Sequence, residues 1–248
     1  MTRDLAGTGF LRRHWFPESD FLEKVTLGLD LRQFHFERNF TFDYDLKYTR
    51  LQPYLRLELG RKEGSYFSHA LQWRTIWLRT QRPLFSNEGE PAGADWDGTA
   101  IHELSYRAEQ DRTLNPFSVE AALEYQQYED TFRRDASYLK ASLEWDAAFY
   151  YAPRRRFDVR VFVGAFIFND RREAGAIFPG AFNLISQGYN DYRFDDLYLG
   201  RSEASGIWSQ QVSLRDGGLK TPVASGFNLG RSNSAIAALN LKMDLPGD

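Results

Sequence analysis

The chain has 248 residues, a formal net charge of −3 and no cysteine. The lack of cysteine excludes a disulfide framework and a thiolate-bound metal, and the balance of 31 basic and 34 acidic residues gives no basic excess for nucleic acid. No run of 18 apolar residues occurs, so no transmembrane helix is predicted. Aromatic residues make up 16% of the chain, and such residues are typical of β-strands and of the rims of membrane barrels.

The N-terminal part of the chain is the least patterned. Residues 1–22 show no clear periodicity and predict an irregular segment ahead of a β-barrel domain over residues 23–248. The first residues also lack the apolar stretch of a signal peptide. Because an exported protein needs such a signal, we expect the chain to be a mature form or a fragment, with the barrel incomplete at both ends.

The next part of the chain predicts several strands, over residues 25–36, 40–59, 66–79 and 100–108. In the second of these the apolar positions change parity around residues 48–51, which predicts a bulge or two separate strands. Residues 87–98 are rich in Gly, Pro, Asp and Glu, and they predict a long polar loop within residues 82–99.

Three segments in the middle of the chain alternate most clearly between apolar and polar residues. They cover residues 117–125, 139–149 and 157–167. A period of two is typical of a strand, in which successive side chains point to opposite faces. The runs also reach the roughly 9–11 residues that a tilted strand needs to cross a bilayer, whereas ordinary strands peak at about 5–6.

The last third of the chain predicts strands over residues 206–215, 219–229 and 235–245, which brings the visible total to about ten. Short and long connections alternate, as they do between the two rims of outer-membrane barrels. We therefore expect residues 60–65, 111–116, 152–156 and 216–218 at the periplasmic rim, and residues 82–99, 130–136, 169–205 and 226–233 at the outer rim.

These patterns predict an all-β fold, an antiparallel transmembrane β-barrel in a bacterial outer membrane. One face of its strands is expected to meet lipid, through Phe117, Val119, Leu123, Leu139, Leu143, Trp145, Phe157, Val159, Val161 and Val163. The opposite face is expected to line the lumen, through Glu120, Glu124, Lys140, Glu144, Asp146, Asp158 and Arg160.

The polar face leaves two functions open. Its charged residues either line a pore and set its ion preference or form a cross-strand network that fills a narrow lumen. The mixed signs of the charges favour the network. A third alternative is a soluble all-β binding protein, in which the apolar faces would pack against each other in a core.

The sequence shows no catalytic constellation. His102-Glu103 begins the zinc-peptidase pattern His-Glu-x-x-His, but Tyr106 stands where the second histidine belongs. The chain has only 4 histidines, and the other three are scattered. We therefore expect no enzyme activity, no metal and no cofactor in this chain.

A resemblance to a known family rests on residues 191–203, which read Asp-Tyr-Arg-Phe-Asp-Asp-Leu-Tyr-Leu-Gly-Arg-Ser-Glu, and on the Ser-Gln-Gln and Gly-Gly motifs that follow. This stretch resembles the C-terminal barrel region of Bacteroidetes outer-membrane proteins that carry a gluzincin-type zinc aminopeptidase. The long loop is also distantly similar to the inward-folded loop of insertase-type surface-antigen barrels. Its candidate functional residues are Asp195, Asp196, Arg201 and Glu203.

The resemblance implies a barrel that anchors an upstream periplasmic or surface domain, a zinc metallopeptidase that this chain does not contain. Its partners would be outer-membrane lipid, the barrel-assembly machinery of a Gram-negative cell and further strands or domains of the same parent protein, with no nucleic acid. The inward-folded loop implies an alternative function, a transport or secretion pore in which Arg201 lies inside the barrel.

Overall fold

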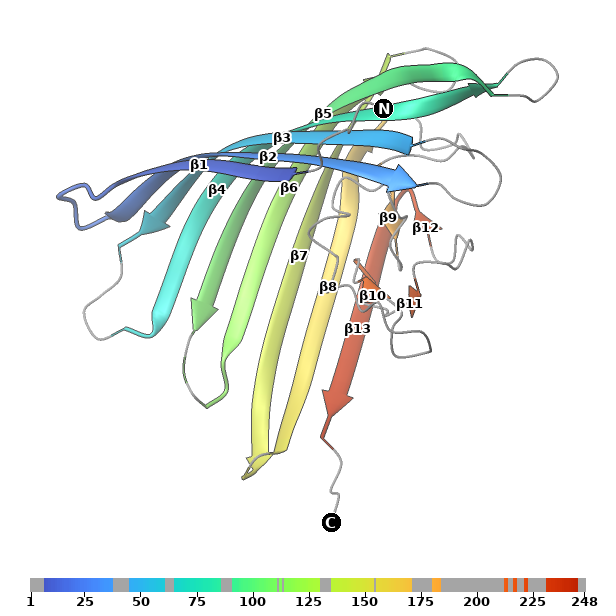
Figure 1. Ribbon diagram of the computed structural model, residues 1–248. Helices are drawn as coiled ribbons and strands as arrows, with labels where there is room; N and C mark the ends of the chain where they lie inside the picture. Colours follow the sequence, from blue (N-terminus) through green and yellow to red (C-terminus); the bar gives the residue numbers. More distant parts are fainter. Residues whose placement is uncertain are drawn as a thin grey trace.

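The computed structural model describes residues 7–37, 45–60, 65–85, 91–110, 112, 114–129, 135–153, 155–170, 180–183, 212–213, 216–217, 221–222 and 231–244. Most of them form one antiparallel sheet of nine strands in the order β1-β2-β3-β4-β5-β6-β7-β8-β13 (Figure 1). The strands are β1 (Gly7–Trp15), β2 (Leu22–Glu37), β3 (Asp45–Leu59), β4 (Phe67–Phe85), β5 (Pro91–Gln110), β6 (Phe117–Glu129), β7 (Asp135–Ala152), β8 (Arg155–Asn169) and β13 (Ala235–Met243).

The main sheet is strongly coiled. In Figure 1 the first strands lie almost across the direction of β8 and β13, so the sheet has a convex and a concave side. Four strands of two residues each lie on the concave side, in the connection between β8 and β13 (Figure 1). They form two separate pairs, β9 (Phe182–Asn183) with β12 (Arg231–Ser232) and β10 (Val212–Ser213) with β11 (Thr221–Pro222).

The two faces of the sheet differ in polarity, because apolar and polar residues alternate and the cross-strand register keeps like residues together. On the convex face Leu143 lies between Ala121 of β6 and Val163 of β8, and 44% of its surface is exposed. On the concave face Glu124 lies opposite Lys140, and both are buried. The sheet therefore exposes its apolar face and buries its charged one, the reverse of a water-soluble core.

The structure confirms the all-β antiparallel fold and corrects several predicted boundaries. Within the segment expected to be irregular, Gly7–Trp15 forms β1, because it pairs along its whole length with β2. The register of β2 with β3 runs without a shift through residues 45–51, so β3 is one strand without the expected bulge.

The expected loop over residues 87–98 is mostly strand. β5 begins at Pro91 and continues the hairpin with β4, in which Phe85 is the partner of Pro91. Arg79 of β4 stacks on the Trp96 ring at 4.5 Å. Cross-strand pairing thus extends the hairpin through a segment whose composition is typical of turns.

The strands expected over residues 206–215 and 219–229 do not join the main sheet in the part of the chain that the structure describes. Only β10 and β11 lie in these ranges, and they pair with each other. The described main sheet accordingly has nine strands, one fewer than the number expected. The described residues include no helix long and apolar enough to cross a membrane.

An aromatic side chain covers a glycine where the sheet coils. Tyr54 of β3 lies opposite Gly28 of β2 on the concave face, and a methyl group added to Gly28 would come within 2.1 Å of the Tyr54 ring. We expect Gly28→Ala to lower the free energy of unfolding by about 1–3 kcal/mol, because the ring must move. Denaturant titration in detergent micelles, followed by tryptophan fluorescence, measures this change.

Gly9→Ala on the neighbouring strand is the matched control, because no heavy atom lies within 4 Å of the added carbon. In a Tyr54→Ala background the cost of Gly28→Ala should disappear, since the clash has lost its partner. An equal cost in both backgrounds would show that the tyrosine ring is not its cause.

Candidate functional site

The candidate site is a network of polar side chains on the concave face of β6, β7, β8 and β13. Its first half centres on Lys140, whose ammonium lies 2.9 Å from Oε1 of Glu124. The Tyr138 hydroxyl donates to the same Glu124 oxygen at 2.6 Å and also lies 2.8 Å from Oε1 of Gln126. These residues come together because the register places Lys140 opposite Glu124 and Tyr138 opposite Gln126. All of them are buried, so the ion pair is withdrawn from water.

The second half of the network centres on Arg160 of β8. Its Nε and Nη2 atoms donate to the two carboxylate oxygens of Glu144, both at 2.8 Å. This two-point geometry is the strongest arrangement of an arginine and a carboxylate. The remaining Nη1 donates to Oδ1 of Asn240 at 3.2 Å and to the main-chain oxygen of Asp216 at 3.1 Å. Arg160 thus joins three strands of the sheet to a residue from the connection between β8 and β13.

Two parts of that connection, residues 180–183 and 216–217, cover the network; we call them the inserted segments. Lys140 donates to the main-chain oxygen of Gly180 at 3.1 Å, and Asn240 donates to that of Gly217 at 3.1 Å. The segments also hold each other, because the Asp216 carboxylate accepts the N–H of Asn183 at 3.0 Å. The charged concave face is therefore closed by main-chain carbonyls of the same chain.

Aromatic packing seats the first inserted segment on the sheet. Phe182 is 1% exposed, and its ring centroid lies 5.2 Å from that of Phe166 and 6.2 Å from that of Phe162. It lies over Gly164, where an added methyl group would come within 2.5 Å of the ring. Gly180 lies in the same way against the Tyr138 ring, at 2.3 Å from an added methyl group. Two glycines thus provide the space in which the segment meets the sheet.

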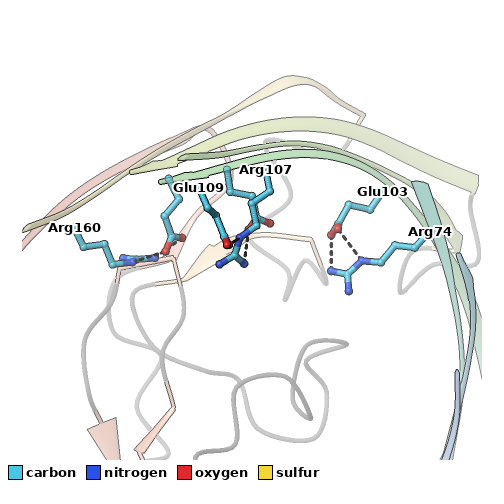
Figure 2. Close-up of polar contacts among 7 residues, drawn as sticks. Arg74, Glu103, Arg107, Glu109 and Arg160 are labelled. Atoms are coloured by element: carbon cyan, nitrogen blue, oxygen red, sulfur yellow. Dashed lines mark hydrogen bonds and ion pairs between the residues drawn. The ribbon is translucent and has the colours of Figure 1, made fainter. Parts of the chain in front are cut away.

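Further ion pairs continue along the concave face (Figure 2). Arg74 of β4 donates to both oxygens of Glu103 of β5, at 2.7 and 2.9 Å. Arg107 contacts Glu109 of its own strand and lies 3.6 Å from Glu120 of β6. Glu103 is buried and Arg74 has 15% of its side chain exposed, whereas Arg107 has 52% of its side chain exposed. Figure 2 shows the labelled side chains pointing to the concave side of the curved sheet.

Aromatic and other large apolar side chains gather at one rim of the sheet. This rim is formed by the end of β1, the start of β2, the starts of β4 and β6 and the end of β7, which antiparallel order brings to the same side. The aromatic residues Trp15, Phe16, Phe21, Tyr66, Phe149, Tyr150 and Tyr151 are each at least 40% exposed there. We call this group the aromatic rim. In membrane barrels, such residues form girdles at the level of the lipid headgroups.

The structure places the sequence-predicted residues on two opposite faces. The residues expected to meet lipid lie on the convex face, where Leu123, Leu143 and Val163 are 40–44% exposed. The residues expected to line the lumen lie on the concave face. They include Asp146, which is opposite Arg160 in the register, and Asp158, which contacts Arg156. The predicted loop residues Asp195, Asp196, Arg201 and Glu203 lie outside the described residues.

Sequence reasoning missed Tyr138, Asn183, Asp216 and Asn240 as members of the network. Tyr138 and Asn240 continue the polar parity of β7 and β13, so alternation could have found them. Residues 216–217 form the expected turn, between the paired strands β10 and β11. The turn was expected at the periplasmic rim, and instead Asp216 is buried beside Arg160 and accepts a hydrogen bond from the N–H of Asn183. No local pattern indicates that residues 180–183 and 216–217 return to the sheet.

The three histidines whose side chains the structure describes show no metal-binding arrangement. His14, His69 and His102 each contact a hydroxyl group, of Thr26, Tyr106 and Thr75 respectively, on different strands. The described residues contain no group of three His, Asp or Glu side chains that could hold a metal ion. Comparison with family models, with curated proteins and with solved structures found no match to the chain.

Removal of the Lys140 charge tests the buried network. Lys140→Met would leave the Glu124 carboxylate buried without its cation, and we expect a loss of about 3–5 kcal/mol in the free energy of unfolding. Denaturant titration in micelles measures it. Arg107→Met is the matched control, because this partly exposed arginine should contribute less than about 1 kcal/mol. A similar loss in both variants would contradict the special role of the buried pair.

A second change tests the seat of the inserted segment. Gly164→Ala should displace the Phe182 ring and raise the amide hydrogen exchange of residues 180–183, with little change in the strands β2 to β5. Hydrogen exchange followed by mass spectrometry measures both regions in one experiment. Gly98→Ala, whose added carbon would make only an ordinary 3.8 Å contact, serves as the control. Unchanged exchange of residues 180–183 in Gly164→Ala would refute this account.

Proposed function

We propose that this chain is the membrane-embedded part of an outer-membrane β-barrel, with its convex face in contact with lipid. The observation that carries the proposal is the reversed burial of the sheet. Leu27, Trp73 and Leu239 are 52%, 48% and 62% exposed on the convex side, whereas Glu124 and Lys140 are buried on the concave side. Such an arrangement is stable where the outer medium is hydrocarbon and the inner one is protein or water.

The extent of the apolar face supports the same conclusion. It extends from β2 to β13, because each strand contributes alternate residues to it, and most of these are apolar. Thr75 and His102 are polar members of this face, and they contact each other. A soluble monomer rarely exposes a contiguous apolar patch larger than a few hundred Å². Each Å² of apolar surface that stays in water lacks the stabilisation of about 25 cal/mol that burial would give. Lipid removes this penalty along the whole face.

The aromatic rim gives a second, independent reason. Seven exposed aromatic side chains lie at one end of the strands, where a membrane would change from hydrocarbon to headgroups. Aromatic rings favour this depth because they have an apolar body and a polar edge or hydroxyl. The strands of the main sheet are also long, from 9 to 20 residues, and a tilted membrane strand needs roughly 9–11.

Within the membrane, the filled concave face favours anchoring over transport. The inserted segments cover the Lys140 and Arg160 clusters with main-chain carbonyls, and opposite charges are paired rather than aligned as a ring of one sign. An open pore of the size seen in large barrels would keep its polar lining hydrated. We therefore propose an anchor, and the zinc aminopeptidase implied by the family resemblance is the domain that we propose it holds at the outer membrane.

The orientation of the two faces can be tested with adjacent residues of β6, because the chain has no cysteine. Leu123→Cys and Ala122→Cys are each labelled with a small fluorophore and refolded into vesicles whose acyl chains carry bromine. We expect the bromines to quench the label on residue 123, on the convex face, and to leave the label on residue 122 bright. Equal quenching of the two labels, or the reverse order, would overturn the proposal.

A further inference from the structure

Among the residues that the structure describes, no strand pairs with the outer edge of β1 or of β13, and these two edges run in the same direction. Every neighbouring pair from β1 to β8, and then β8 with β13, is antiparallel, so strand direction alternates along the order of nine strands. The first and ninth strands of such a series are parallel to each other. β1 and β13 therefore cannot close the sheet by the antiparallel pairing that all its other strands use.

The hydrogen bonds of β13 show which backbone groups point to its free edge. Ser234 accepts from the N–H of Phe166, and Asp244 donates to the main-chain oxygen of Arg156. In an antiparallel pair, residues whose N–H and C=O groups point to the partner strand alternate with residues whose N–H and C=O groups point away from it. The even-numbered residues of β13 thus bond to β8. The N–H and C=O groups of Ala235, Ala237, Leu239, Leu241 and Met243 point to the free edge.

The free edge of β13 carries few of the features that protect edge strands from pairing. The strand contains no proline and one charged residue, Lys242. Its odd-numbered residues are exposed and mostly apolar, with Leu241 at 59%. Exposed edges without proline, charge or bulge accept further strands. In hydrocarbon the unpaired groups would each cost several kcal/mol, so the proposed membrane location makes a partner necessary.

We propose that the free edge of β13 binds a strand from a partner polypeptide segment, antiparallel to β13, as the next strand of the barrel. This inference rests on the proposed function. A second copy of the chain does not fit, because copies inserted in the same orientation would place β1 of one parallel to β13 of the next. Closure by antiparallel pairs needs one additional strand, or another odd number of them, between β13 and β1.

The chemistry of the partner strand follows from the residues that it meets. On the convex side its alternate residues lie beside Leu239 and Leu241 and face the same medium, so they are apolar. On the concave side its residues lie beside Asn240 and Lys242, so they are polar or small. β8 meets both conditions on the other side of β13. Its convex residues Val159, Val161 and Val163 lie opposite Leu241, Leu239 and Ala237, and its concave residues opposite Asn240 and Lys242 are Arg160 and Asp158.

A peptide with the sequence of β8 is therefore a suitable probe. We expect it to bind to the full chain in detergent micelles, measured by fluorescence anisotropy of the labelled peptide. Ala237→Pro removes a free-edge N–H without interrupting the bonds to β8, and it should weaken binding about tenfold or more. Ala237→Val keeps the N–H and should bind as the unmodified chain does. A peptide of the same composition with its apolar residues in one block should not bind.

Four results would overturn the inference. Two concern the peptide: no binding of the β8 peptide, or equal binding by Ala237→Pro and Ala237→Val. The third is a thiol cross-link between Leu11→Cys on β1 and Leu241→Cys within one chain, which would show direct closure. The fourth is dimer cross-linking of chains that carry only Leu241→Cys, which would show a second copy at this edge. Each result can occur while residue 123 still faces lipid, so it would leave the proposed function standing.

Discussion

The requirement that buried charges be paired governs the concave face of this sheet. Alternation brings polar residues of every strand to that side, and the register then decides which charges meet. Lys140 lies directly opposite Glu124, and Arg74 lies directly opposite Glu103. A slip of one residue would turn these charges to the convex side and bring leucines into the polar network. The ion pairs and the apolar face therefore both favour the same register.

A contact between an aromatic ring and a glycine recurs on the concave side of the sheet. Tyr54 covers Gly28 within the sheet, Phe182 covers Gly164 where the inserted segment meets it, and Tyr138 lies against Gly180 from the sheet side. Each glycine removes a side chain from a crowded concave surface, and each ring fills the space that a coiled sheet would otherwise leave. The same contact thus occurs between β2 and β3 and between the first inserted segment and the strands β7 and β8.

The sequence predicts the faces of the strands better than it predicts their number and ends. Alternation over residues 117–167 assigns Leu123, Leu143 and Val163 to one face and Glu124, Lys140 and Arg160 to the other, as the structure has them. The strand β1 and the start of β5 escaped detection, since arginines and turn-forming residues are held there by pairing with β2 and β4. Such pairing is a property of two segments and leaves no signal in either alone.

The candidate site is likewise predictable from the sequence only in part. The charged half of the network follows from parity, whereas the inserted segments do not, because Gly180 and Asp216 take part through main-chain oxygens that any residue would offer. The side chains that receive them are Lys140 and Arg160, both with donors left over after their ion pairs. A long polar connection after β8 is visible in the sequence, but its return to the sheet depends on contacts between residues 40 and 56 positions apart.

The free edge and the apolar face impose opposite conditions on the medium around β13. Water would satisfy the unpaired N–H and C=O groups of Leu239 and Leu241 and leave their side chains exposed at a cost. Hydrocarbon would satisfy the side chains and leave the backbone groups unbonded. Both conditions are met when another strand covers the edge while lipid covers the face. In the barrel that we propose, membrane insertion and strand addition at β13 would therefore be coupled, because each process would lower the free energy of the other.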